Sequence, residues 1–284
     1  ADCWETYARE DLTCSNQQCV VHELYKSCQT IVGDTHEDVM DYEMITFGAI
    51  MAMSTPEGAS NPRGDFRSKA LELGYGQFNQ RLGADDQPFR VRVCDHQGDS
   101  EQVEALADYL VNERHVPLLI TSGSQDTLNA SVVTIASKAL LLSISATSPE
   151  LRGLNDNGLV WCMSPSDALV GKAVADSIIV ESEEAAPSIG IIYIDDVYGQ
   201  GLQNEFKKRY QERYPSTSVN SYSFKANDIN SIDSALDHLR QDSVDKLFVI
   251  AFSEDGAYIS NEVAGVIASV QPISGPSVLP LNCD

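Results

Sequence analysis

Small hydroxyl side chains follow two consecutive predicted strands in the middle of the chain. The loop after the first strand contains Ser122 and Ser124; the end of the second contains Ser143, Ser145, Thr147 and Ser148. In an open α/β sheet, ligands bind at the carboxyl ends of the strands. The first loop also opens a predicted helix, whose free N–H groups favour an anion such as a carboxylate. The stretch therefore predicts a site that holds a small polar ligand by hydrogen bonds.

Acidic and aromatic residues follow two later predicted strands. The strand expected at 188–194 precedes Tyr198, and the strand expected at 246–252 precedes Glu254 and Asp255. Either acid is suited to pair with a ligand ammonium, and a tyrosine can close over it with ring and hydroxyl. A structural role is the alternative for each residue alone, with the acids as helix N-caps. Together with the hydroxyl site, the set predicts a zwitterionic ligand.

The sequence gives weaker support for a catalytic or metal-binding site than for this ligand-binding site. His96 lies in CDHQGD at a predicted strand end, but no G-x-S-x-G elbow accompanies it. Cys94, His96 and Asp99 lack a metal-site spacing. DHQGD instead predicts a turn that caps the following helix. A hydrolase that uses His96 or Ser124 remains the alternative from a different functional class.

The amino-acid composition of the chain restricts the classes of molecule that it can bind. The 284 residues include 19 basic and 42 acidic side chains, a net charge of −23. Nucleic-acid binding needs a basic surface, so this balance argues against it. No apolar run approaches the roughly 20 residues of a membrane span. The length suits two domains, and if the protein is exported we expect this to be the processed form.

Four of the seven cysteines crowd the first 28 residues, which indicates disulfides and an oxidising compartment. The disulfide candidates are Cys3, Cys14, Cys19 and Cys28. Their pairing stays open, since four cysteines allow three connectivities. A zinc knot is the rival interpretation, although its usual C-x2-C pairs are absent. The odd total leaves at least one thiol without a partner in the chain, a first indication that the sequence is incomplete.

Strands and helices alternate beyond the cysteine-rich segment. We predict three regions: an extension over 1–41, a first α/β lobe over 42–157 and a second over 158–284. The first lobe is expected to have strands at 44–52, 89–94, 117–121 and 139–145 and helices at 65–82, 99–113 and 126–138. The second is expected to have strands at 159–163, 188–194, 219–225, 246–252 and 277–281 and helices at 167–182, 200–213, 230–241 and 254–270. Such alternation predicts parallel sheets covered by helices on both faces.

Several motifs in this order resemble a known family. They are DHQGD at 95–99, SISATSPEL at 143–151, MSPSDALVGKAVAD at 163–176 and IIYIDDVYGQGL at 191–202. Over 45–281 the chain resembles the type I periplasmic solute-binding proteins, the extracellular ligand-binding receptors of the leucine/isoleucine/valine-binding kind. The resemblance implies two α/β lobes, joined by hinge strands, that close on a ligand between them.

The resemblance also implies a role for each candidate residue. Ser124 matches the serine that binds the ligand α-carboxylate. Ser145 matches a residue that offers its backbone carbonyl to the ammonium, and Thr147 a threonine that binds through hydroxyl and backbone. Tyr198 matches a tyrosine that meets the ligand on closure, and Glu254 the acid that neutralises the ammonium. A slip of one residue would give this last role to Asp255.

The implied function is that of an exported, non-enzymatic receptor, periplasmic or extracellular, for an amino acid of the branched-chain or a similar kind. No cofactor is implied, and the expected partner is the permease of an ABC-type uptake system. A sensory ectodomain coupled to a regulator is the alternative; a secreted hydrolase is a remote one. Relatives cross back from the second lobe and complete both sheets, so we expect a C-terminally incomplete fold or a shorter receptor. The loop over 52–56, Gly123 and the N-terminal extension also depart from the family pattern.

Overall fold

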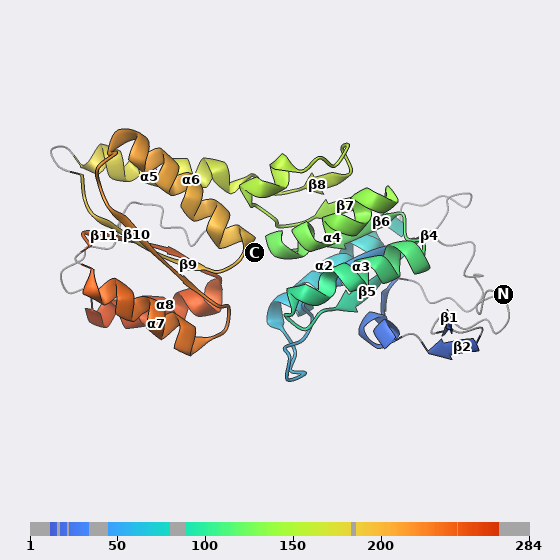
Figure 1. Ribbon diagram of the computed structural model, residues 1–284. Coiled ribbons are helices and arrows are strands. Elements are labelled where there is room, and N and C mark those ends of the chain that lie inside the picture. Colours follow the sequence, from blue (N-terminus) through green and yellow to red (C-terminus); the bar gives the residue numbers. More distant parts are fainter. Residues whose placement is uncertain are drawn as a thin grey trace. The chain divides into compact units, whose positions relative to one another are not determined.

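The computed structural model describes residues 12–15, 18–21, 23–33, 45–79, 89–182, 186–242 and 244–266 (Figure 1). It divides the chain into two compact units. Unit 1 takes the residues up to Ile144 together with Asp156–Trp161, and unit 2 takes Ser145–Asn155 and the residues from Cys162 on. The chain therefore passes between the units three times, where the sequence suggested a single boundary after residue 157.

Unit 1 is built on a six-stranded sheet in the order β3-β5-β4-β6-β7-β8. Its strands are β3 (Thr30–Val32), β4 (Ile45–Met51), β5 (Phe89–Asp95), β6 (Leu118–Thr121), β7 (Leu140–Ser143) and β8 (Val160–Cys162). Strand β4 pairs in parallel with β5 and β6, and β6 pairs in parallel with β7. Its helices are α2 (Pro62–Asn79), α3 (Val103–Asp108) with the short turns η3 (Ser100–Gln102) and η4 (Tyr109–Glu113), and α4 (Ser124–Ser137). The predicted parallel sheet is confirmed here.

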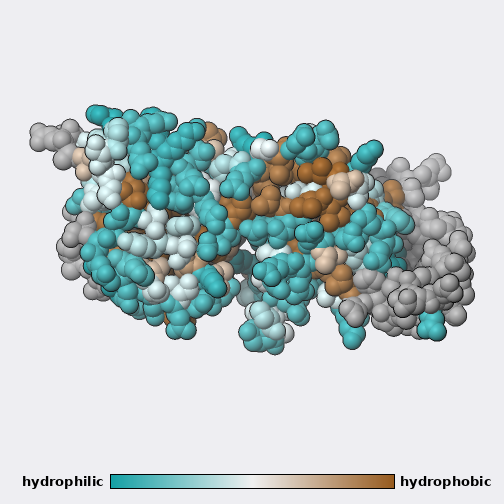
Figure 2. All heavy atoms as spheres, viewed as in Figure 1, coloured by the Kyte–Doolittle hydropathy of each residue, from teal (hydrophilic) through white to brown (hydrophobic). Residues whose placement is uncertain are grey.

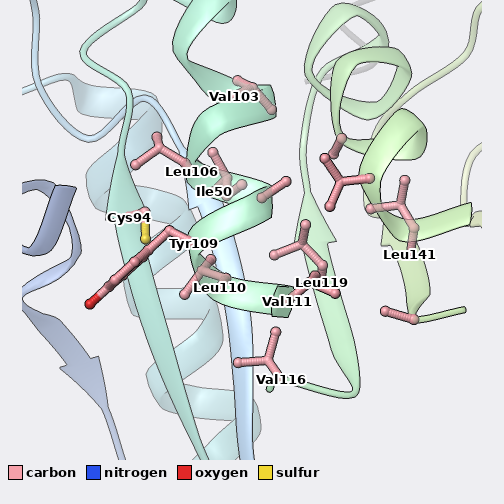
Figure 3. Packing of buried hydrophobic residues seen from close by; sticks show 14 of the residues in the cluster. Ile50, Cys94, Val103, Leu106, Tyr109, Leu110, Val111, Val116, Leu119 and Leu141 are labelled. Carbon is pink, nitrogen blue, oxygen red and sulfur yellow. The ribbon is translucent and has the colours of Figure 1, made fainter. Parts of the chain in front are cut away.

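Alternating side chains place apolar residues on both faces of this sheet, as expected of buried strands. One face packs under α3 and α4, with Ile50, Leu119 and Leu141 against Leu106 and other helical residues. Figure 3 shows this cluster and the Tyr109 ring beside Cys94. The other face packs against α2. Burial on both faces explains why the strands read as apolar runs.

Unit 2 contains a three-stranded parallel sheet in the order β10-β9-β11. Its elements are η5 (Pro149–Gly153), α5 (Asp167–Glu181), β9 (Ile189–Ile194), α6 (Val197–Arg213), β10 (Val219–Phe224), α7 (Ile229–Gln241), β11 (Lys246–Ile250) and α8 (Ser253–Val266). Figure 1 shows α5 and α6 on one face and α7 and α8 on the other. Strand β9 serves both layers, since Ile191 faces the first and Ile192 the second. The strand predicted at 277–281 lies outside the described residues.

The N-terminal segment is partly built into unit 1. A hairpin of β1 (Leu12–Ser15) and β2 (Gln18–Val21) comes first, with Cys14 and Cys19 as backbone partners. The turn η1 (Glu23–Cys28) follows, and β3 then pairs antiparallel with β5 at the sheet edge. Residues 23–33 thus extend the first sheet, although the sequence suggested a separate extension.

The described disulfide joins Cys28 to Cys94. The expectation that Cys28 pairs within the N-terminal group of four is therefore wrong. Its partner lies 66 residues away in β5, and the pairing of β3 with β5 brings the two together. The buried Arg92 guanidinium strengthens this junction by donating a hydrogen bond to the Cys28 carbonyl. Cys3 lies outside the described residues.

Part of the apolar surface of unit 1 is exposed. Figure 2 shows apolar residues gathered over β7 and β8, where Leu140 is 45% and Trp161 62% exposed. Within the described residues, no helix is long and apolar enough to cross a membrane.

Candidate functional site

Strand β6 delivers two buried serines to the carboxyl edge of the first sheet. Ser122 follows the strand, Gly123 in an extended conformation caps α4, and Ser124 is the first residue of that helix. Both serines are at least nine-tenths buried. The structure therefore places Ser124 where the sequence predicted it, at a helix N-terminus that favours negative charge.

The neighbouring hydroxyl groups bond to one another. The Thr127 hydroxyl lies 2.8 Å from the Ser143 Oγ and 2.9 Å from the Thr121 Oγ1. Ser143 also donates to the Ser122 carbonyl, at 3.2 Å. These bonds hold the ends of β6 and β7 to the first turn of α4. Ser143 thus has a structural role that its position in the hydroxyl-rich stretch did not reveal.

An acidic residue that the sequence did not single out lies in the same turn. Asp126 is the third residue of α4 and is 7% exposed. Its carboxylate accepts a hydrogen bond from Ser100, at 2.8 Å, and lies 3.4 Å from the His96 Nε2. Burial works to raise the pKa of Asp126, but His96, Ser100 and the more distant Arg67 together hold that pKa below its ordinary value. The carboxyl group is therefore ionised at neutral pH.

The turn predicted at DHQGD is confirmed in part. The Asp99 side chain caps η3 by accepting the Glu101 N–H, and the Gln102 side chain donates to the Asp99 carboxylate. Asp95 has a structural role that the sequence did not predict. It accepts the backbone N–H groups of Met53 and Ser54 and the Ser54 hydroxyl. The loop after β4, which departs from the family pattern, is thus anchored to the end of β5.

His96 contacts Asp126 and not Ser124. The residue is 3% exposed, and its ring pairs with Asp126 and forms no hydrogen bond with Ser124. A nucleophilic serine needs a base within hydrogen-bond reach. Among the described residues there is also no group of three or more His, Cys, Asp or Glu side chains that could hold a metal ion.

Thr147 and Ser145 belong to unit 2, although the sequence assigned them to the first lobe. Thr147 is 5% exposed, and its hydroxyl donates to the Asp167 carboxylate at 2.5 Å. The Asp167 N–H returns a bond to the Thr147 carbonyl. Burial raises the pKa of Asp167, and the bond from Thr147 opposes that rise. Ser145 is half-buried. Ser124 therefore lies in unit 1, and Ser145 and Thr147 lie in unit 2.

Tyr198 lies near the start of α6. Asp196 caps this helix by accepting the Gly199 N–H. A Cβ at Gly199 would meet the Ile194 carbonyl at 2.1 Å, so this tight turn requires glycine. The half-buried Tyr198 ring stacks on Phe252 at 5.5 Å between ring centroids. The ends of β9 and β11 are therefore neighbours at one edge of the sheet.

The two adjacent acids at the start of α8 have different surroundings. Asp255 is 6% exposed and accepts the Asn227 N–H with both carboxylate oxygens. Glu254 is exposed and accepts a hydrogen bond from the Ser253 hydroxyl. Asp255 thus braces the loop after β10, whereas the Glu254 side chain is exposed. The assignment of the ligand ammonium to Glu254 stays a prediction.

These two α/β units, each with polar residues at the carboxyl edge of a parallel sheet, define a class of two-unit binding protein. A family model described as "Periplasmic binding protein" matches residues 44–269. The chain belongs to this family, as a type I member. A search of curated proteins finds no significant match.

Solved structures show the same fold. The leucine binding protein LivK from Thermotoga maritima aligns with a TM-score of 0.65 at 15% identity, covering 81% of this chain and 62% of that one. The branched-chain amino acid transporter substrate binding protein LivJ from Streptococcus pneumoniae, in complex with isoleucine, aligns with a TM-score of 0.62 at 19% identity, covering 81% and 63%. A solute binding protein from Rhodopseudomonas palustris, in complex with 3,4-dihydroxybenzoic acid, aligns with a TM-score of 0.60 at 16% identity, covering 78% and 58%. The chain thus spans less than two thirds of the length of these structures.

Proposed function

We propose that this chain is an extracytoplasmic receptor that binds a free amino acid, of the branched-chain or a similar kind, for an ABC-type uptake system. The observation that carries the proposal is the buried Ser124 at the first turn of α4. A hydroxyl beside a helix N-terminus is suited to a carboxylate. The exposed Glu254 at the start of α8 supplies the negative charge that an ammonium group requires.

Unit 2 contributes the other predicted contacts. The Tyr198 ring, held by Phe252, offers an apolar face and a hydroxyl to the ligand. Ser145 offers its backbone carbonyl from unit 2, and the Thr147 hydroxyl, which donates to Asp167, is left as an acceptor for the ligand. A ligand that contacts residues of both units stabilises a closed state, which is the signal that a permease would recognise. The two solved relatives named for leucine or branched-chain amino acids support this ligand class.

Thermal unfolding with each of the twenty amino acids, and with 3,4-dihydroxybenzoate as a non-amino-acid probe, tests the proposal. Binding raises the melting temperature by mass action. We expect stabilisation by one or a few amino acids and by no other probe. Absence of stabilisation by any amino acid would refute the function.

Two substitutions test the roles within the site by calorimetry. Ser124→Ala should weaken binding about tenfold or more, because a buried ligand carboxylate loses a donor. Glu254→Gln should weaken it similarly by leaving the ammonium without a countercharge. The matched controls are Ser137→Ala at the other end of α4 and Glu262→Gln at the other end of α8; both should bind as the unaltered chain does. Unchanged affinity in Ser124→Ala would remove that residue from the site.

A further inference from the structure

Ser100, the first residue of η3, is bonded to α4 through both its hydroxyl and its carbonyl. Its Oγ donates to the Asp126 Oδ1 at 2.8 Å, and the Asn129 Nδ2 donates to its carbonyl oxygen at 2.7 Å. Asp126 and Asn129 are three residues apart, so they lie on one face of the helix. The Asn129 amide is itself oriented by Gln125, whose Nε2 donates to the Asn129 Oδ1 at 2.9 Å. A single residue of the turn after β5 is therefore bonded to two successive turns of α4.

The turn η3 is capped without the Ser100 hydroxyl. Asp99 caps it by accepting the Glu101 N–H, and the Gln102 side chain donates to the same carboxylate. The Ser100 hydroxyl is instead directed across to Asp126. Its bond therefore acts between the turn and the helix, at the carboxyl edge of the first sheet.

The first turn of α4 is also held from a second side, by Thr127. The Thr127 hydroxyl bonds to side chains at the ends of β6 and β7. Ser100 adds a further anchor, from the turn after β5, through the buried Asp126. Ser124 belongs to this same turn, two residues before Asp126. The segment that carries the Ser124 hydroxyl is thus fixed from three strand ends.

We propose that Ser100 is a positioning residue for the ligand carboxylate: through Asp126 it fixes the first turn of α4, so that Ser124 meets the carboxylate without further ordering. The inference rests on the proposed function and adds to its site a residue that acts through Ser124. A site gains affinity when its contact groups are already in place, because ordering them on binding costs free energy. Loss of the Ser100 hydroxyl should therefore weaken binding only while Ser124 contributes to it.

A double-mutant cycle, measured by calorimetry with L-leucine on the whole chain, tests this inference. Ser100→Ala should weaken binding about threefold to tenfold, the usual range for one hydrogen bond. In the Ser124→Ala background the same change should alter the affinity by less than about twofold, because the contact that it positions is already lost. A variant that binds too weakly for calorimetry is compared by the rise in its melting temperature at high L-leucine concentration.

Matched variants separate the role of the hydroxyl from a general effect on the fold. Ser100→Thr keeps the hydroxyl, so it should bind L-leucine as the unaltered chain does. Ser137→Ala removes a comparable bond at the other end of α4, from the Ser137 hydroxyl to the Asn112 Oδ1 at 2.7 Å, and should also leave the affinity unchanged. Without ligand, the Thr127 amide, which donates to the Gly123 carbonyl, should exchange its hydrogen faster in Ser100→Ala and at the unaltered rate in Ser137→Ala.

The outcomes separate the inference from the function. Unchanged binding of L-leucine by Ser100→Ala would overturn the inference and leave the function standing. An equal fold loss in both backgrounds would show that Ser100 acts apart from Ser124 and would also overturn it, as would unchanged exchange of the Thr127 amide. If no amino acid binds, the proposed function fails and the inference fails with it; if another amino acid binds in place of L-leucine, the cycle is measured with that one.

Circular dichroism on each variant identifies one that does not fold. Should Ser100→Ala not fold, the pair Ser100→Thr and Ser100→Val, which have the same shape and differ in the hydroxyl, replaces it in both backgrounds. Equal affinity of these two variants would then overturn the inference.

Discussion

The carboxyl edges of the two sheets differ in how their polar residues are held. In unit 1, Ser122, Ser124 and Asp126 are all buried, and hydrogen bonds tie the first turn of α4 to the strand ends. In unit 2, Glu254 is exposed, and the half-buried Tyr198 ring stacks on Phe252. The first edge is preorganised, so it needs little ordering when a ligand binds. At the second edge, side chains are exposed to water, which a bound ligand would displace.

The largest expected effect concerns the disulfide, which among the described residues occurs in unit 1 alone. Replacing Cys28 and Cys94 by serine should lower the free energy of unfolding of unit 1 by about 2–5 kcal/mol, because the unfolded chain loses a long-loop constraint. Hydrogen exchange should then increase in β5 and stay unchanged in β9. The control Cys162→Ser alters an exposed thiol. Equal loss of protection in both sheets would mean that the two units unfold as one.

The next effect concerns Asp126. Asp126→Asn should lower the free energy of unfolding at pH 7 by about 1–3 kcal/mol, because the bond from Ser100 and the contact with His96 lose their negatively charged partner. Folding lowers the pKa of Asp126: burial opposes the shift, and the contacts with His96 and Ser100 outweigh it. Its stabilisation is therefore present above the ordinary carboxyl pKa and is lost as the pH falls through the lowered value. Urea unfolding between pH 3 and 7 should show this acid-side loss in the unaltered chain and not in Asp126→Asn.

A smaller effect is expected at Tyr198. Tyr198→Leu should cost about 0.5–1.5 kcal/mol of stability, because the ring stack with Phe252 is lost. Tyr198→Phe keeps the stack and is the control for it. Weaker amino-acid binding by Tyr198→Phe in calorimetry would assign the hydroxyl to the ligand. Binding equal to that of the unaltered chain would confine the residue to packing.

The smallest effect concerns Asp167, the buried acid of unit 2. Burial raises its pKa, against the bond from Thr147. A raised carboxyl pKa gives stability that is greatest below the ordinary value and declines as the pH rises through the raised one. Asp167→Asn should remove this decline and change the stability at pH 7 by less than about 1 kcal/mol, since an asparagine oxygen still accepts the Thr147 hydroxyl. A loss as large as that of Asp126→Asn would show that the two buried acids are equivalent.

Local signals in the sequence predicted much of the fold. Ser166 caps a helix that begins at Asp167, the first residue of the helix predicted at 167–182. Strands expected at 89–94 and 219–225 end within one residue of the observed ends, because buried runs bounded by polar turns depend on few distant contacts. Helix α6 begins at Val197, three residues before the prediction, because the Asp196 side chain caps it by accepting the Gly199 N–H.

Features that depend on distant residues were harder to predict. The partner of Cys28 is set by the pairing of β3 with β5, which no local pattern indicates. The assignment of Ser145 and Thr147 to unit 2 depends on three chain crossings. Asp126 gave no signal of its own, because an acidic residue in the first turn of a helix is common. Only the fold brings it next to His96, which follows β5.

The sequence by itself determined the strand and helix order, the family, and the hydroxyl and acidic residues at strand ends, because these follow from local periodicity, capping and short motifs. Only the tertiary structure decided which of those residues are buried, which are bonded to one another, and that Glu254 rather than Asp255 is exposed. Burial and partner choice depend on packing between segments far apart in the chain. Those are the properties that set the charge balance at the start of α4.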